Sequence, residues 1–229
     1  MKDLKDYRSK ELLSYVIANI LLFLLCTNMF DMIFDADHVD SFNFVSTLFG
    51  AAVYGSILFI YVYLIDSLFP GDRKDYIAWF GKYNLPGCRI FVDLKNKERD
   101  IRLKKDDAIK KYKIIYDNMP VDKKKIAKYQ NAAWYGIYKR HRDAGSVYTA
   151  NRDYLLCRDL YISTLSMAVL YILIVLFFYI VKENDIFSIE FCVILIIEGV
   201  LTNLAMHGKG WRFCYNVIAE DINTKDDVD

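Results

Sequence analysis

The residues of this chain most able to do chemistry are charged side chains placed in or beside long apolar stretches. Arg152 and Arg158 come just before a run of 22 residues, 160–181, that carries no charge. Glu198 lies deep inside another apolar run, "VILIIEGVLTN", and Asp66 lies at the inner end of a third. A carboxylate near the middle of a bilayer costs about 2.5–3.5 kcal/mol on insertion scales, so it is expected to face water or a partner. These positions predict an ion pathway or a polar contact inside a membrane.

The arginines have two interpretations. In the first, Arg158 anchors the apolar run by extending its guanidinium to lipid headgroups. In the second, several copies of the chain assemble about an axis, and one arginine per copy forms a ring that favours the passage of anions. Ser163 follows in the same run, where a hydroxyl would be easily hydrated at a pore mouth. Glu198 would face a pore, pair with a basic residue or carry a proton. The candidate pore and gating residues are Arg152, Arg158, Ser163, Glu198 and Asp66.

Residues 70–159 interleave aromatic rings with lysine and arginine. Two stretches show this pattern, "YIAWFGKY" (76–83) and "YQNAAWYGIYKRHR" (129–142). Aromatic faces stack nucleobases while Lys and Arg bind phosphates, so the pattern is typical of a nucleotide or single-stranded nucleic-acid site. In the alternative, Trp79 and Trp134 belong to the segment's own core or lie at headgroup level, and the lysines hold anionic lipid. The candidate ligand-binding residues are Trp79, Lys82, Trp134, Tyr135, Tyr138, Lys139, Arg140 and Arg142.

Four apolar blocks must position these residues. Residues 12–34, 45–65, 160–181 and 186–206 form blocks that are 21 to 23 residues long. A helix needs about 20 apolar residues to cross ~30 Å of hydrocarbon, so each block is long enough. We therefore expect an all-α membrane protein with four transmembrane helices in two hairpins, and a small, mostly helical cytoplasmic domain inserted between spans 2 and 3.

The distribution of lysine and arginine predicts the orientation of the spans. Residues 70–160 carry 22 Lys and Arg against 12 Asp and Glu, whereas the short loop 35–44 carries no Lys or Arg. Basic segments stay in the cytoplasm, so both termini and the middle segment are expected there. The predicted division is 1–69 for the N-terminal tail and first hairpin, 70–159 for the basic cytoplasmic domain, 160–207 for the second hairpin and 208–229 for the cytoplasmic C-terminal tail.

Local patterns predict the elements of the cytoplasmic domain. Residues 88–94, "CRIFVDL", are expected to form a short strand or extended segment. Residues 95–117 alternate charge at helical spacing, with apolar residues seven apart, which predicts one amphipathic helix. Asp122 is expected to cap a helix that ends near residue 141. From about Tyr148, a helix is expected to run unbroken into the third span.

Catalytic signatures are absent from the sequence. It contains no Walker loop, no GxSxG, no GxGxxG after a strand and no HExxH. The three histidines fall in three compartments of the predicted topology, and the five cysteines show no CxxC spacing. We therefore expect no catalytic residue, no metal site, no cofactor and no enzymatic activity.

The run Asn151–Arg158, "NRDYLLCR", has the pattern N-R-x-x-L-x-x-R at the entry to the third predicted span. With four spans and a basic insert, this layout resembles the membrane effectors of bacterial antiphage defence systems. It looks most like the transmembrane effector of the Hailong system, and the membrane component of the Kiwa system is its rival. The Hailong resemblance implies a homotetrameric channel in the inner membrane, closed by a single-stranded DNA oligomer that a partner nucleotidyltransferase makes. Loss of the oligomer would open an arginine-lined, anion-conducting pore; Arg152 and Arg158 match the pattern, with Arg140 and Arg142 as alternatives.

A second class of function fits the same sequence. A non-conducting membrane sensor or scaffold would recruit a cytosolic defence partner through the basic insert. The two classes differ in one observable, because a channel depolarises the membrane when it is activated and a scaffold leaves the membrane potential unchanged.

Overall fold

The computed structural model describes residues 4–27, 69–97, 100–181 and 187–224, and all regular structure within these ranges is helical. The helices are α1 (Leu4–Cys26), α4 (Gly71–Ala78), the short 3-10 helix η1 (Pro86–Cys88), α5 (Ile90–Asn96), α6 (Lys105–Lys111), α7 (Lys113–Asp117), α8 (Lys123–His141), α9 (Gly145–Val181) and α10 (Ile189–Asn223). The prediction of an all-α fold is confirmed for this part of the chain. The chain divides into two compact units, Met1–Lys74 with Asp159–Asn203, and Asp75–Arg158 with Leu204–Asp229. We call them unit 1 and unit 2.

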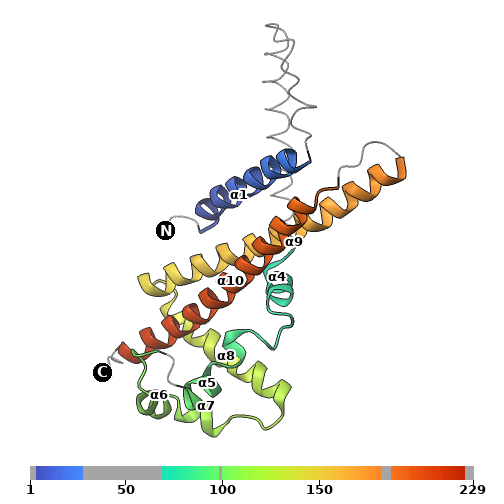
Figure 1. The fold of residues 1–229 in the computed structure, drawn as a ribbon. Coiled ribbons are helices and arrows are strands. Elements are labelled where there is room, and N and C mark those ends of the chain that lie inside the picture. Colours follow the sequence, from blue (N-terminus) through green and yellow to red (C-terminus); the bar gives the residue numbers. More distant parts are fainter. Residues whose placement is uncertain (1–3, 28–68, 98–99, 182–186, 225–229) are drawn as a thin grey trace. The chain divides into compact units, whose positions relative to one another are not determined.

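The long helices α9 and α10 form a hairpin and contribute to both units (Figure 1). An 18-residue window in each helix has a mean hydropathy of 2.6 or 2.0, yet only 17% of that window is buried within the chain. Apolar helices of 37 and 35 residues are longer than the ~30 Å of a bilayer core. Both helices are therefore long and apolar enough to span a membrane. Of the other two predicted spans, the first is described only in part, as α1, and residues 45–65 lie outside the described residues.

Unit 1 is held together by an apolar core among α1, α9 and α10. Tyr171 of α9 and Phe191 of α10 lie in the buried cluster, with Met167 and Leu195 beside them. The Phe23 ring of α1 meets Tyr171 and Phe191 edge-on, at centroid distances of 5.9 and 5.4 Å. Edge-on aromatic contacts of this kind contribute about 0.5–1.5 kcal/mol each beyond the area they bury.

Unit 2 is a small helical domain in which α8 packs against η1 and α5. The buried Gln130 side chain of α8 makes the connection, because its Oε1 accepts from the backbone N–H of Val92 and its Nε2 donates to the carbonyl of Cys88, at 3.0 and 2.9 Å. Gly87 allows the close approach, since a Cβ built at this position would lie 2.6 Å from Asn131 Oδ1.

Two local predictions for this domain are confirmed. Asp122 caps α8, and its carboxylate accepts from the backbone N–H groups of Lys124 and Lys125 at 3.1 and 3.0 Å. The helix expected from about Tyr148 is α9, which begins at Gly145 and continues without a break to Val181.

Two other local predictions are wrong. Residues 88–94 form the end of η1 and most of α5 instead of a strand. Ile90, Phe91 and Leu94 are buried while Val92 is exposed, which is the periodicity of a helix lying on a core.

The single amphipathic helix expected over 95–117 is replaced by two short helices, α6 and α7. Lys97 and Lys104 have extended backbones, and Ile101 of the proposed apolar stripe is exposed, although Leu103 and Ala108 are buried. The spacing of apolar residues was helical, but only part of that stripe lies on a core, which does not stabilise one continuous helix.

Candidate functional site

Glu198 lies in a polar cluster inside unit 1. Its carboxylate accepts from Tyr15 Oη at 2.7 Å and contacts Asn19 Nδ2 at 3.4 Å. Tyr15 Oη also contacts Thr164 Oγ1 at 2.8 Å, and Thr164 Oγ1 donates to the Leu160 carbonyl at 3.0 Å. Helices α1, α9 and α10 each supply a member, so the cluster ties the apolar core of unit 1 together through polar groups.

The polar contacts of this cluster run from one helix to the next. The Tyr15 hydroxyl donates to Glu198, and the Thr164 hydroxyl donates to the Leu160 carbonyl. The contact between the Tyr15 and Thr164 hydroxyl oxygens joins these two bonds. The arrangement is therefore a chain of oxygen atoms that begins at the Glu198 carboxylate and ends on a backbone carbonyl.

Ser163, predicted as a pore residue, precedes Thr164 of this polar cluster in the sequence. Its side chain is buried, and neither Ser163 Oγ nor Asn19 Oδ1 has a hydrogen-bond partner among the described residues. Asp66 lies outside the described residues.

Arg158 is held inside unit 2 by Asp75. Its side chain is 7% exposed, and Nη1 donates to Asp75 Oδ1 at 2.9 Å. The same oxygen accepts from the Tyr154 hydroxyl at 2.8 Å, and Tyr154 Oη in turn accepts from Trp79 Nε1 at 3.0 Å. Burial and the Asp75 charge raise the pKa of Tyr154 above its usual value. The Tyr154 hydroxyl therefore stays protonated and donates a hydrogen bond to Asp75.

Arg152 lies in a different environment from Arg158. It is half-buried and its Nη2 lies 3.0 Å from Asp153 Oδ1, while Lys209 Nζ lies 2.8 Å from Asp153 Oδ2. Burial acts to raise the pKa of Asp153, but hydrogen bonds from Lys209 and Arg152 outweigh it and lower the pKa below its usual value. The two arginines of "NRDYLLCR" thus each have a carboxylate partner in this conformation.

Three of the predicted ligand-binding residues line one cavity of about 250 Å³ in unit 2. They are Trp134, Tyr135 and Tyr138 of α8, and α9 adds Tyr154 and Arg158 to the wall. Asp75 and residues of η1 and α10 complete the lining. A cavity of this size is large enough to accept part of a planar ring system.

Five of the residues that line this cavity carry aromatic rings. Trp134 and Tyr138 lie parallel, with 7° between planes and 5.7 Å between centroids. Phe213 meets both edge-on at 5.3 Å, and it lies nearly parallel to Tyr154 at 6.2 Å. The buried Trp134 Nε1 has no acceptor among the described residues, so the wall contains one unused hydrogen-bond donor. We call this site the aromatic cavity.

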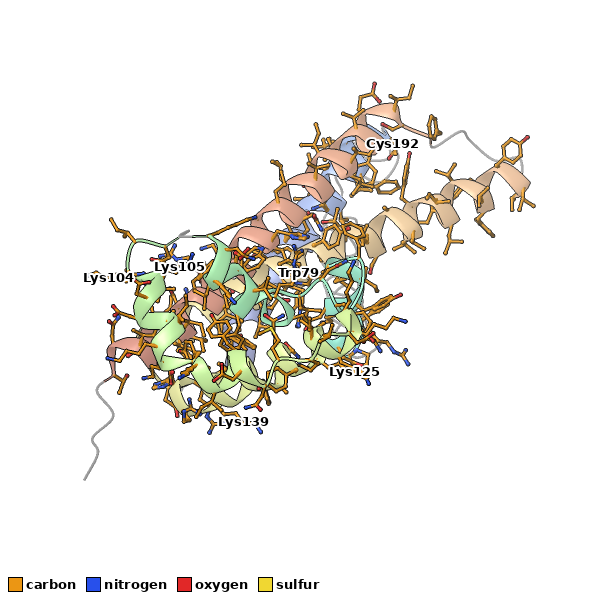
Figure 2. All side chains as sticks on the ribbon, turned by 90° about the horizontal axis from the view of Figure 1, so that it is seen from below. Trp79, Lys104, Lys105, Lys125, Lys139 and Cys192 are labelled. Atoms are coloured by element: carbon orange, nitrogen blue, oxygen red, sulfur yellow. The ribbon has the colours of Figure 1, made fainter. Side chains whose placement is uncertain are left out.

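The other predicted ligand-binding residues do not line the cavity themselves. Trp79 is buried, and its ring packs against His207 at 4.1 Å, as in the alternative that assigned it to the core. Asn84 Nδ2 fixes this position by donating to the carbonyls of Trp79 and Phe80, where the chain turns at the end of α4. Figure 2 shows Trp79 among the crowded side chains of the fold.

The cations near the cavity have partners of their own. Lys139 Nζ lies 4.8 Å from the centre of the Tyr135 ring, and Lys82 lies 5.3 Å from that of Tyr83. Arg140 Nη2 binds Asp221 Oδ1 at 3.1 Å, and Arg142 lies 3.6 Å from Asp143. Lys139 and Lys125 lie toward opposite ends of α8 (Figure 2). Of the cationic side chains predicted for ligand binding, Lys139 is therefore next to the cavity through its contact with Tyr135.

Asp221 is a buried carboxylate whose contacts the sequence did not reveal. Its carboxylate accepts from Tyr112 Oη at 2.8 Å and from Arg140, and His141 Nε2 lies 2.8 Å away. Burial acts to raise the pKa of Asp221, but these hydrogen bonds and the charge of Lys111 together lower it. A single carboxylate near a chain end carries no local signal of such a role.

Other members of both sites were also missed. Tyr15 and Asn19 reach Glu198 from more than 170 positions away, so no local pattern connects them. For the aromatic cavity a signal did exist: Asn151, Tyr154, Leu155 and Arg158 are spaced 0, 3, 4 and 7 along α9, which places them on one helical face.

The described residues contain no group of three or more His, Cys, Asp or Glu side chains that could hold a metal ion. Comparison of the chain with protein-family models, with curated proteins and with solved structures gives no match.

Proposed function

We propose that this chain is a homotetrameric transmembrane effector of bacterial antiphage defence. In this proposal it forms an ion channel, selective for anions, that depolarises the inner membrane. A nucleotide or single-stranded DNA oligomer, made by a partner nucleotidyltransferase, binds the cytoplasmic part and controls gating. The "NRDYLLCR" resemblance and the two long apolar helices support this assignment.

One observation carries the proposal: the aromatic cavity includes Arg158 in its wall. Trp134, Tyr135 and Tyr138 supply faces on which a base can stack, and base stacking contributes about 1–3 kcal/mol per base. Arg158 lines the cavity with these rings and is also one of the two candidate pore arginines. A ligand phosphate that approaches the cavity competes with Asp75 for Arg158, which connects ligand binding to the position of this side chain.

The apolar surfaces of α9 and α10 support an assembly in the membrane. Most residues in their apolar windows are not buried within one chain, so lipid or further copies of the chain cover them. A symmetric assembly places one copy of each arginine around the axis, and arginine rings favour anions. A ligand that changes a pore from 99% open to 99% closed must bind the closed state more tightly by about 5.5 kcal/mol, which stacking and phosphate contacts supply together.

The proposal is tested with the full chain purified in lipid nanodiscs. We expect a copurifying nucleic acid, visible in the ratio of absorbance at 260 and 280 nm, and ligand-dependent currents in a planar bilayer. Tyr135→Ala should weaken retention of the oligonucleotide about tenfold, because Tyr135 lines the cavity and its ring is half-exposed. Tyr76→Ala is the matched control, since Tyr76 is also exposed and lies outside the cavity lining. A wild-type protein without nucleic acid and without current contradicts the proposal.

The second candidate is a non-conducting membrane sensor or scaffold. It is favoured by the pairing of Arg152 with Asp153 and of Arg158 with Asp75, since neither guanidinium is without a carboxylate partner in this conformation. The exposed lysines of α8, which include Lys125 and Lys139, then offer a basic surface to a cytosolic partner. An unchanged membrane potential during activation in cells supports the scaffold and rejects the channel.

A further inference from the structure

We propose that unit 2 contains a second binding site, for a phosphate group, in a polar cleft that is separate from the aromatic cavity. The cleft has a volume of about 330 Å³ and is lined by the start of α9, the C-terminal part of α10 and Arg102. Its side chains are almost all polar: Arg102, Ser146, Thr149, Asp153, Lys209, Arg212 and Asn216. We call it the polar cleft.

Helical spacing explains why these residues face one another. Lys209, Arg212 and Asn216 lie at spacings of 0, 3 and 7 along α10, on one face of the helix. The residues of α9 that line the cleft have the same kind of spacing, and the two helices are joined across it. Lys209 Nζ binds Asp153 Oδ2 at 2.8 Å, and Asn216 Nδ2 donates to the Ser146 carbonyl at 3.1 Å.

The aromatic cavity uses other faces of the same two helices. Gly210, Phe213 and Cys214 of α10 line that cavity, and none of them lines the polar cleft. The two sites therefore differ in chemistry as well as in position: one presents aromatic rings, and the other presents cations, hydroxyls and an amide.

The charge of the polar cleft is positive. Its lining contains three cations and one carboxylate. Arg102 is held in place, because its Nη2 binds Asp100 Oδ2 at 2.6 Å and Asn216 Oδ1 at 2.8 Å. Asp100 and Asp153 are the ion-pair partners of Arg102 and Lys209. The charge of Arg212 also acts on Asp100, but at longer range than an ion pair. Among the described residues, the Arg212 side chain makes no ion pair or hydrogen bond, and it is exposed.

Phosphate is the anion that suits these donors. A guanidinium presents a fork of N–H groups that matches phosphate oxygens, and the Ser146 and Thr149 hydroxyls lie in the same lining. The cleft also lies at the start of α9, where the helix dipole adds favourable potential for an anion. A base or another large ring would find no aromatic face here to stack upon.

The position of the cleft along α10 favours a phospholipid headgroup as the source of the phosphate. The apolar block of α10 ends at residue 206, so Lys209 and Arg212 follow about 5 and 9 Å beyond it along the helix axis. The headgroup layer begins at that level and is about 5–8 Å thick on each side of a bilayer. This choice of source rests on the proposed membrane location, whereas phosphate binding by the cleft does not.

The test uses the full chain in detergent micelles, in two arms. In the first, native mass spectrometry measures the retention of phosphatidylglycerol against phosphatidylcholine. In the second, ³¹P NMR titration measures the binding of inorganic phosphate. Arg212→Gln should weaken anion binding about tenfold, and Arg212→Lys should restore part of it, because lysine keeps the charge but lacks the guanidinium fork. Arg89→Gln, at an exposed arginine outside the lining, is the matched control and should change binding less than twofold.

The outcomes separate the sources and the proposals. Selective retention of phosphatidylglycerol that is lost in Arg212→Gln supports a lipid headgroup in the cleft. Binding of inorganic phosphate alone, lost in the same variant, supports the site with a soluble phosphate as its ligand. Equal binding by the wild type and Arg212→Gln in both arms, or no binding by the wild type, overturns the inference. Because neither arm measures oligonucleotide or current, failure here is distinct from failure of the channel proposal.

Discussion

We expect the ion pair between Asp75 and Arg158 to contribute strongly to the free energy of unfolding. Asp75→Asn removes the carboxylate charge but keeps an oxygen that accepts from Tyr154, so the buried Arg158 loses its counter-charge and little else changes. At the N–O distance of 2.9 Å, and with an effective dielectric constant of about 20, the gross attraction is about 6 kcal/mol. The Asp75 side chain is 24% exposed and desolvation opposes the attraction, so we expect a net loss of about 2–3 kcal/mol in the free energy of unfolding.

A double-mutant cycle measures this coupling. The free energy of unfolding is determined in micelles for the wild type, Asp75→Asn, Arg158→Gln and the double variant. We expect an interaction energy of about 1.5–3 kcal/mol, with the double variant more stable than the sum of the single losses predicts. Tyr154→Phe is the control, since it removes a hydroxyl from the same carboxylate and leaves the ion pair intact. Additivity within about 0.5 kcal/mol would refute the reasoning, because Arg158 would then not be bound to Asp75.

The same substitution has a functional consequence under the channel proposal. A loss of about 2 kcal/mol from the state that holds Arg158 shifts the closed–open equilibrium about 30-fold. Asp75→Asn should therefore raise the basal current in a planar bilayer. A normal basal current, in a variant whose coupling energy is lost, assigns Arg158 to anchoring rather than to gating.

Three further predictions concern other parts of the chain. Glu198→Gln should retain the stability of unit 1 within about 0.5 kcal/mol, because the amide oxygen can still accept from the Tyr15 hydroxyl, whereas Glu198→Ala should lose about 1–3 kcal/mol. Thermal unfolding of both variants measures this, and equal losses would contradict a stabilising contact between Tyr15 and position 198. Gly87→Ala should destabilise unit 2 by about 1–3 kcal/mol, since its Cβ would lie 2.6 Å from Asn131 Oδ1, while Gly136→Ala, with open space around its Cβ, should be neutral or stabilising in the same assay. The lowered pKa of Asp221 means that its contribution to stability is complete above the unfolded pKa of about 3.9 and is lost as the pH falls through the folded pKa. In Asp221→Asn, the free energy of unfolding should therefore fall less steeply as the pH is lowered below about 4. An unchanged pH dependence in this variant would contradict the role of Asp221.

Elements with strong local signals could be predicted from the sequence. The Asp122 cap and the long apolar helix after Tyr148 both depend on residues that are close in sequence, and both are present in the structure. The segment 88–94 could not be predicted in the same way. A short apolar run fits a strand or a helix equally well, and here the choice is made by Gln130, which bonds to Cys88 and Val92 from about 40 positions away.

In the candidate site, too, features of neighbouring residues could be predicted, whereas contacts between remote segments could not. The aromatic residues Trp134, Tyr135 and Tyr138 were recognisable because they cluster in the sequence. The sequence did not show that they meet Phe213, or that Asp75 binds Arg158, because these contacts join remote segments. Composition indicated that arginine and carboxylate are unusual near hydrocarbon, but only the three-dimensional structure identifies which charge compensates which.

The mass of the extracted protein in native-like lipid tests the central claim most directly, because a single chain cannot form a ring of arginines. The proposal predicts a tetramer, with four times the 26.8 kDa of the chain, or about 107 kDa of protein in each particle. Particles that contain only one 26.8 kDa chain, across a range of lipid compositions and protein concentrations, would contradict a pore formed between subunits.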